Sequence, residues 1–132
     1  FAPIQFVQLH GDESFEDALS LQRRASIPVI KAVRVNEQTD WDEIGRYVDQ
    51  LSGVLLDSDS KGYGGSGHGF DWSMIPKTLR SKIILSGGLT VDTVSEAIQQ
   101  VAPYALDVSS GIEQAKGIKD FEKMQVFIAN CK

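Results

Sequence analysis

Cysteine is nearly absent from this chain of 132 residues, since Cys131 is the only one. A single thiol can form neither an internal disulfide nor a zinc site built from several cysteines, which excludes the small secreted scaffolds that depend on them. The low cysteine content favours a reducing compartment, so we expect a cytoplasmic protein. We also expect neither a membrane helix nor a signal peptide, because no run approaches the ~18 apolar residues of a membrane helix and no basic segment precedes an apolar one among the first residues given.

Positive charge is scarce, because 13 Lys and Arg stand against 18 Asp and Glu and leave a net charge of -5. Nucleic acids require clustered Lys and Arg, so we expect no nucleic-acid partner. A local site can still bind an anionic small molecule whatever the net charge is. With 42% apolar and 23% charged residues, the composition is typical of one globular domain, which we place at residues 1–132.

Short apolar segments alternate with segments of helical periodicity along the chain. The predicted strands are Ile4–Leu9, Val29–Val35, Gly53–Leu56, Lys82–Leu85 and Ala105–Val108. The predicted helices are Phe15–Arg24, Trp41–Leu51 with a capping box at Thr39 and Asp42, a short one from Asp71 toward Leu79, one capped by Thr90 and one capped by Asp120. Strands that are apolar throughout are buried on both faces, which predicts a parallel sheet with helical crossovers.

Two architectures of the α/β class are compatible with this pattern. Five strands can form a complete doubly wound domain, or five of the eight units of a (β/α)8 barrel, whose full length is typically ~250 residues. The chain length favours the open sheet. The loops favour the barrel, because the chemically interesting residues follow the carboxyl ends of the strands. We therefore expect a partial TIM barrel of about five βα units.

Two loops rich in small residues follow the last two predicted strands. Gly87 and Gly88 precede one helix, and Ser109, Ser110 and Gly111 come before the last helix. Backbone N–H groups at such positions can bind a phosphate near the positive end of a helix dipole. Paired glycines alone are equally typical of plain turns, but two adjacent loops of this kind form the recurrent phosphate site of (β/α)8 barrels.

Asp57 directly follows the third predicted strand, where a carboxyl group at the mouth of the sheet can act as a general acid. A loop carboxylate hydrogen-bonded to its neighbours is the alternative interpretation. His10 ends the first predicted strand and faces the same edge, either as a substrate contact or as a hydrogen-bonded buried histidine.

The sequence resembles phosphoribosylanthranilate isomerase, a barrel enzyme of tryptophan biosynthesis. The matching segments, in family order and spacing, are residues 7–13, 28–35, 55–72, 84–98 and 105–128. The resemblance implies an Amadori rearrangement of N-(5′-phosphoribosyl)anthranilate to 1-(2-carboxyphenylamino)-1-deoxyribulose 5-phosphate. It implies no metal and no organic cofactor. Indole-3-glycerol phosphate synthase shares the phosphate loops, but the segment from Gly64 to Trp72 fits the isomerase better.

The resemblance also implies roles for individual residues. Asp57 takes the position of the general acid that protonates the furanose oxygen as the ring opens. The phosphate-binding residues are then Gly87, Gly88, Ser109, Ser110 and Gly111. Asp107 lies at a strand end near the substrate, and Gln8 and His10 lie near the mouth.

One part of the family pattern is not found in these residues. The family barrel begins with a strand ending in Lys-x-Cys-Gly, whose cysteine is the general base, and an arginine after the second strand receives the anthranilate carboxylate. We therefore expect strands four to eight here, the base on a separate N-terminal segment, and no activity from this chain alone. Open sheet edges predict association with that segment or with a second copy.

Two other functions are compatible with the residues. A half-barrel could bind phosphate without catalysing anything. A receiver-like regulatory domain could use Asp57 as phospho-acceptor, although no acidic pair directly follows the first predicted strand and no lysine directly follows the fifth.

Overall fold

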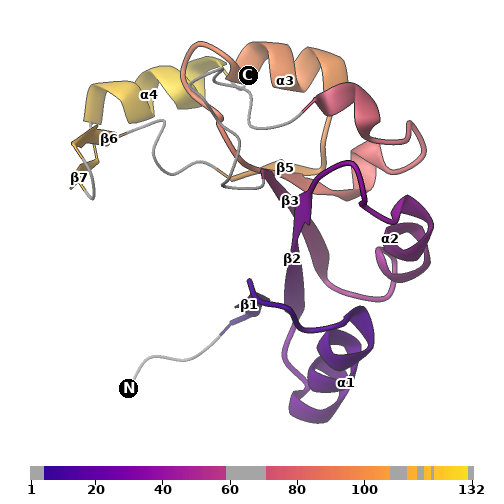
Figure 1. The fold of residues 1–132 in the computed structure, drawn as a ribbon. Coiled ribbons are helices and arrows are strands. Elements are labelled where there is room, and N and C mark those ends of the chain that lie inside the picture. Colours follow the sequence, from indigo (N-terminus) through magenta and orange to yellow (C-terminus); the bar gives the residue numbers. More distant parts are fainter. Residues whose placement is uncertain (1–4, 59–70, 108–112, 116–117, 120, 131–132) are drawn as a thin grey trace.

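A computed structural model shows a parallel sheet with helices on its outer side, and it describes residues 5–58, 71–107, 113–115, 118–119 and 121–130 (Figure 1). The elements in chain order are β1 (Val7–Leu9), α1 (Phe15–Ala25), β2 (Val29–Val35), α2 (Trp41–Tyr47), β3 (Gly53–Ser58), η1 (Trp72–Met74), η2 (Arg80–Lys82), β4 (Ile84–Leu85), α3 (Val94–Val101), β5 (Ala105–Leu106), β6 (Glu113–Ala115), β7 (Ile118–Lys119) and α4 (Phe121–Asn130). No helix in these ranges is both long and apolar enough to span a membrane.

The order of the strands decides between the two predicted architectures. The sheet runs β1-β2-β3-β4-β5, and every neighbouring pair is parallel. A receiver-like doubly wound sheet has the order 2-1-3-4-5, whereas strands in chain order are those of a barrel wall. Figure 1 shows the sheet curving, with α1, α2 and α3 along the outside of the curve. The receiver-like alternative is therefore wrong.

The two faces of the sheet are packed differently. Val54 and Leu56 of β3 are 0% exposed and join the core that the helices cover. On the opposite face Gly53 lies between two isoleucines, since a Cβ there would be 3.1 Å from Cδ1 of Ile84 and 3.3 Å from Cγ1 of Ile30. Large side chains from alternate strands fill the interior of a barrel in layers. The small residue on β3 leaves room for those from β2 and β4.

Helices α1 and α2 each begin where a side-chain oxygen accepts a hydrogen bond from a backbone N–H group of the first turn. Ser14 caps α1 as its Oγ accepts from the backbone N–H of Asp17 at 3.0 Å. The predicted capping box of α2 is wrong, because Asp40 caps that helix through the N–H of Glu43 at 3.0 Å. Thr39 instead accepts from the N–H of Asn36 at 2.9 Å and closes the preceding turn.

The predicted short helix after Asp71 is confirmed at its start and stops early. Asp71 caps η1 by accepting from the Ser73 hydroxyl at 2.7 Å and from the Ser73 N–H at 2.9 Å. These bonds hold the pKa of Asp71 below its usual value of 3.8, the side-chain bond most. The helix ends at Met74 because Ile75 is extended, with φ -72° and ψ 120°, as a residue before a proline must be.

Several strand limits differ from the prediction. A 3-10 turn takes Arg80–Lys82 and shortens the predicted strand Lys82–Leu85 to its last two residues. The last strand of the sheet stops at Leu106, while Val108 lies outside the described residues, as does Ile4 before β1. The antiparallel pair β6 and β7 was not predicted, since its few residues show no alternation of apolar and polar types.

Candidate functional site

A row of polar side chains crosses four strands at the carboxyl edge of the sheet. Arg34 of β2 is paired in register with Asp57 of β3. The ladder continues one residue past the paired leucines, because Ser86 N–H donates to Leu56 at 2.9 Å and Asp107 N–H donates to Leu85 at 2.9 Å. Side chains alternate between the faces of a strand, so these four lie on the inner face, opposite the core. We call Arg34, Asp57, Ser86 and Asp107 the polar row.

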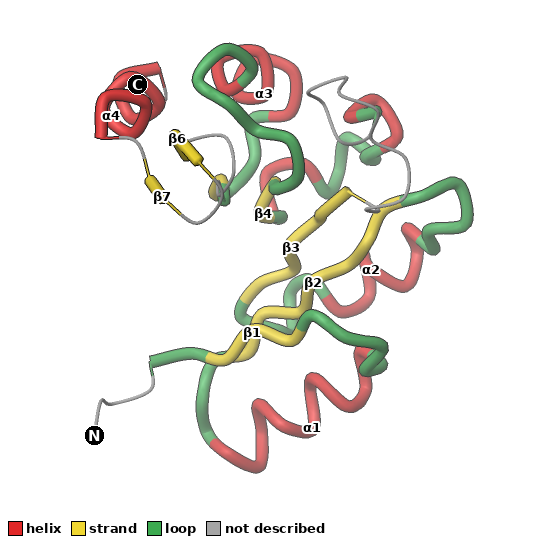
Figure 2. The backbone as a smooth tube through the Cα atoms, turned by 60° about the vertical axis from the view of Figure 1, so that its left-hand side comes forward, coloured by secondary structure: helices red, strands yellow, loops and turns green. Residues whose placement is uncertain are grey.

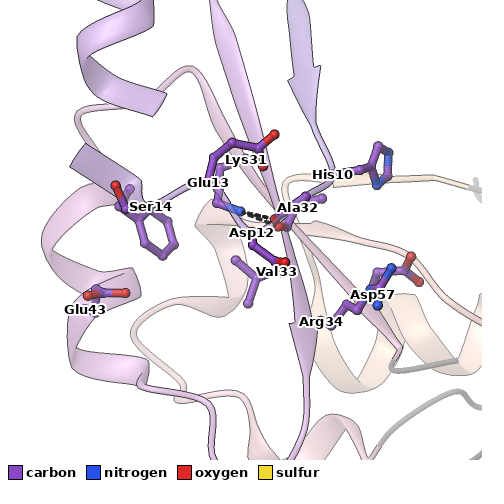
Figure 3. A pocket seen from close by; sticks show the side chains of 12 residues that line it. His10, Asp12, Glu13, Ser14, Lys31, Ala32, Val33, Arg34, Glu43 and Asp57 are labelled. Atoms are coloured by element: carbon purple, nitrogen blue, oxygen red, sulfur yellow. Dashed lines mark hydrogen bonds between the residues drawn. The ribbon is translucent and has the colours of Figure 1, made fainter. Parts of the chain in front are cut away.

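A pocket of about 550 Å³ opens at the Arg34 end of the polar row. Figure 3 shows His10, Arg34 and Asp57 on one side of β2, with Lys31, Glu13 and Glu43 on the other. The lining residues are His10, Gly11, Asp12, Glu13, Ser14, Phe15, Lys31, Ala32, Val33, Arg34, Glu43 and Asp57. The predicted general acid and the predicted histidine therefore share one cavity.

Lys31 is a buried cation beside this pocket, only 6% exposed. Its Nζ donates to the carbonyl oxygens of Gly11 at 3.1 Å and of Ala32 at 3.2 Å. A buried ammonium is stable only when hydrogen-bonded. The bond to Gly11 ties the loop after β1, which begins at His10, to strand β2. Unlike Lys31, Arg34 is an exposed residue of this pocket.

The structure brings the predicted residues Gln8 and His10 together. The Gln8 side-chain amide donates to Nε2 of His10. Gln8 lies in register with Ile30, which puts it on the same inner face as the polar row.

The glycine loop after β4 has the backbone that its residues predict. Gly87 has φ 84° and Gly88 has φ 76°, which side chains rarely permit. Directly before them, the Ser86 hydroxyl donates to Oδ2 of Asp107 at 3.1 Å. Phosphate binding by the two glycines stays a prediction. The second predicted phosphate loop, Ser109, Ser110 and Gly111, lies outside the described residues.

Sequence reasoning missed two members of the polar row. Arg34 carried a signal, because it is a charged residue near the end of an otherwise largely apolar strand. Placing it beside Asp57 required the register of two strands, which a single sequence does not contain. Ser86 was hidden in a loop assigned to phosphate. Within the described ranges, no cluster of His, Cys, Asp and Glu is arranged to hold a metal ion.

Comparison with known proteins decides the family. A sequence profile described as N-(5′-phosphoribosyl)anthranilate isomerase matches residues 2–130, nearly the whole chain. The chain belongs to the phosphoribosylanthranilate isomerase family. The resemblance of the sequence to that family is thereby confirmed.

Family members from bacteria are similar over almost the whole chain. The phosphoribosylanthranilate isomerase of Dechloromonas aromatica is 46% identical over 127 residues, and that of Pseudomonas putida KT2440 is 46% identical over 131 residues. These matches cover 96% and 98% of this chain but 59% and 62% of the relatives. The chain therefore spans about three-fifths of the length of the curated relatives it matches.

Solved family members share the fold. The enzyme from Thermotoga maritima is 40% identical and superposes with a TM-score of 0.75 over 97% of this chain and 62% of its own. Another solved isomerase, in complex with reduced 1-(o-carboxyphenylamino)-1-deoxyribulose 5-phosphate, is 36% identical with a TM-score of 0.71 over 97% of this chain and 59% of its own. These neighbours are (β/α)8 barrels, so the predicted barrel fold class is confirmed.

Proposed function

We propose that this chain carries the general-acid and phosphate-binding part of a phosphoribosylanthranilate isomerase. The carrying observation is the position of Asp57, which lies in the pocket and between Arg34 and Ser86 in the polar row. The family to which the chain belongs supports the substrate, N-(5′-phosphoribosyl)anthranilate.

In the proposed reaction Asp57 gives its proton to the furanose ring oxygen. The bond from that oxygen to C1 breaks, and the anthranilate nitrogen forms a double bond to C1. Loss of the C2 proton to a base then gives an enamine, which tautomerises to the ketone of the product. Asp57 becomes an anion in the first step, and the positive charge of Arg34, its register partner on β2, stabilises that anion in this proposal.

The other predicted residues bind the substrate in this proposal. Gly87, Gly88, Ser109, Ser110 and Gly111 hold the phosphate through backbone N–H groups and hydroxyls. Asp107 contacts the sugar, and His10, whose ring contacts the Gln8 side chain, contacts the substrate near the mouth of the barrel.

The general base and the assembly remain predictions. We expect the base on an N-terminal segment, and association either with such a segment or with a second copy. One solved neighbour is a monomeric form of the dimeric isomerase from Thermotoga maritima. A cytoplasmic location, expected from the cysteine content, is checked by cell fractionation.

The test measures binding and turnover separately. Calorimetry with reduced 1-(o-carboxyphenylamino)-1-deoxyribulose 5-phosphate reports binding. Turnover of freshly prepared substrate is followed with the chain alone and with the N-terminal segment of the Pseudomonas putida relative. We expect binding in both mixtures and turnover in the second. Binding without turnover in either mixture favours the non-catalytic half-barrel, and absence of binding contradicts the proposal.

Two variants test the assigned residues. Asp57→Asn should lower turnover by about 10² to 10⁴-fold, the range for a positioned acid, and should leave binding of the reduced product close to wild type. Asp49→Asn, in an exposed ion pair with Lys82, is the matched control. Gly88→Asp should abolish inorganic phosphate binding, because it adds a negative charge to the loop at a φ of 76°.

A further inference from the structure

Ser86 joins three strands at the centre of the carboxyl edge. Its backbone N–H donates to Leu56 of β3 at 2.9 Å, and its hydroxyl donates to Oδ2 of Asp107, directly after β5, at 3.1 Å. Ser86 is itself only 8% exposed. Its hydroxyl is thus a fixed donor, held by the ladder between β3 and β4.

Asp107 is an exposed side chain at the end of a two-residue strand. An exposed carboxylate samples several rotamers unless a hydrogen bond selects one. Among the described residues, the Ser86 hydroxyl is the side-chain donor that bonds it. The hydrogen bond occupies one carboxylate oxygen and leaves the other available to a ligand.

We propose that Ser86 is a positioning residue, which fixes the Asp107 carboxylate toward the substrate and links it to the glycine loop. The link follows from the chain, because Gly87 and Gly88 come directly after Ser86 and have φ of 84° and 76°. A phosphate bound by this loop is therefore connected to Asp107 through Ser86 and its hydroxyl. This inference rests on the proposed function for the identity of the ligand.

Coupling of this kind is reciprocal, so it is measurable from either end. If Asp107 is fixed by Ser86, removing both side chains weakens ligand binding by about as much as removing the Asp107 side chain alone. If Ser86 only fills space, the losses of ligand affinity from the two substitutions add. Threonine keeps the hydroxyl and tests whether the donor, and not the volume, matters.

The binding experiment is a double-mutant cycle on the complete chain with reduced 1-(o-carboxyphenylamino)-1-deoxyribulose 5-phosphate. We expect Ser86→Ala to weaken binding by about 10-fold or more, as for a hydrogen bond to a charged group. Ser86→Ala in an Asp107→Ala background should change it little, and Ser86→Thr should restore it. Ser81→Ala, at an exposed serine of η2, is the matched control. Additive losses, or no recovery in Ser86→Thr, overturn the proposal.

A second measurement separates this inference from the proposed function. Three-bond NMR couplings report the χ1 rotamer of Asp107 without any ligand. We expect one rotamer in the wild type and averaging in Ser86→Ala. Equal averaging in both proteins overturns the positioning role whatever the affinities are. A third result is that Asp107 has one rotamer in the wild type and averages in Ser86→Ala, while the wild type binds no reduced product. That result supports the positioning role and contradicts the proposed function.

Discussion

At the scale of single residues, the main electrostatic feature is the position of Arg34 beside Asp57. The two side chains lie on neighbouring strands in the same register, and both line the pocket. A guanidinium presents several donors in a planar fork that matches a carboxylate. Arg34 is therefore suited to the moment when Asp57 has lost its proton.

We predict that Arg34→Met lowers turnover of the complemented protein by at least about 10-fold, because a preorganised donor at a developing anion is removed. Arg34→Lys keeps the positive charge and should retain more of the turnover than the methionine variant. Steady-state kinetics measure both, and Arg46→Met, in the last turn of α2, is the control. Equal turnover in wild type and Arg34→Met would contradict this role.

The carboxylate of Asp71 gives a prediction about pH. Its pKa is lowered in the folded protein by the hydrogen bonds from Ser73. At pH values between the pKa of Asp71 in the folded protein and 3.8, the unfolded chain binds more protons than the folded protein. The contribution of Asp71 to the free energy of unfolding is therefore complete above pH 3.8 and is lost as the pH falls through the pKa of the folded protein. Asp71→Asn should flatten the stability curve in that window. Urea unfolding from about pH 2 to 6 measures it, with Asp92→Asn as the control.

Single residues were predictable where one strand was sufficient to place them. Asp57 directly follows the predicted strand Gly53–Leu56, so its position at the carboxyl edge could be read from the sequence, and the resemblance to the family placed Asp107 at a strand end. The roles of Arg34 and Ser86 depend on their neighbours on other strands. Their contacts depend on register, which the structure supplies.

At the scale of elements, local chemistry sets where helices begin and end. Ser14 was one of several polar residues before α1, and hydrogen-bond geometry selected it. Pro76 ended η1 earlier than periodicity indicated, since a residue before proline avoids helical backbone. Apolar periodicity predicted the five strands of the parallel sheet and the helices between them but missed β6 and β7, and competing caps and turns decided the limits of the elements.

Helix α2 contains a glycine that the structure does not require. A Cβ on Gly45 would have its nearest neighbour, Cδ2 of Leu79, at 3.8 Å, an ordinary contact. We predict that Gly45→Ala raises the free energy of unfolding by about 0.4–1 kcal/mol, because alanine reduces the freedom of the unfolded chain. Urea denaturation measures the change.

Gly53→Ala is the matched control for that substitution. A Cβ at Gly53 would lie 3.1 Å from the Cδ1 of Ile84, so the same chemical change should destabilise the protein. If both alanine variants shift stability in the same direction, the packing argument is wrong.

At the scale of the whole molecule, the sheet formed by the described strands has β1 at one edge and β5 at the other. Figure 2 shows β1 at one side of β2, and no described strand pairs with its outer edge. Phe6 lies directly before β1 and is 53% exposed. An uncovered edge strand beside an exposed aromatic side chain is a template for pairing with another chain.

We predict that the chain self-associates through β1 in a concentration-dependent manner. Phe6→Lys should weaken this association, because a lysine at an edge opposes strand pairing. Leu21→Lys, at a residue 37% exposed on α1, should leave it unchanged. Sedimentation velocity over a range of concentrations compares the three proteins. A monomer at all concentrations, or equal effects of both lysines, would contradict the prediction.

Because the strands follow one another in chain order, each member of the polar row comes from a different βα unit. No unit holds two of them. A cut in the connection between α2 and β3 would leave Arg34 on one piece and Asp57 on the other, joined through the β2–β3 ladder and the shared hydrophobic core. In such a two-piece protein, ligand binding would report whether the two pieces had associated with β2 and β3 in the native register.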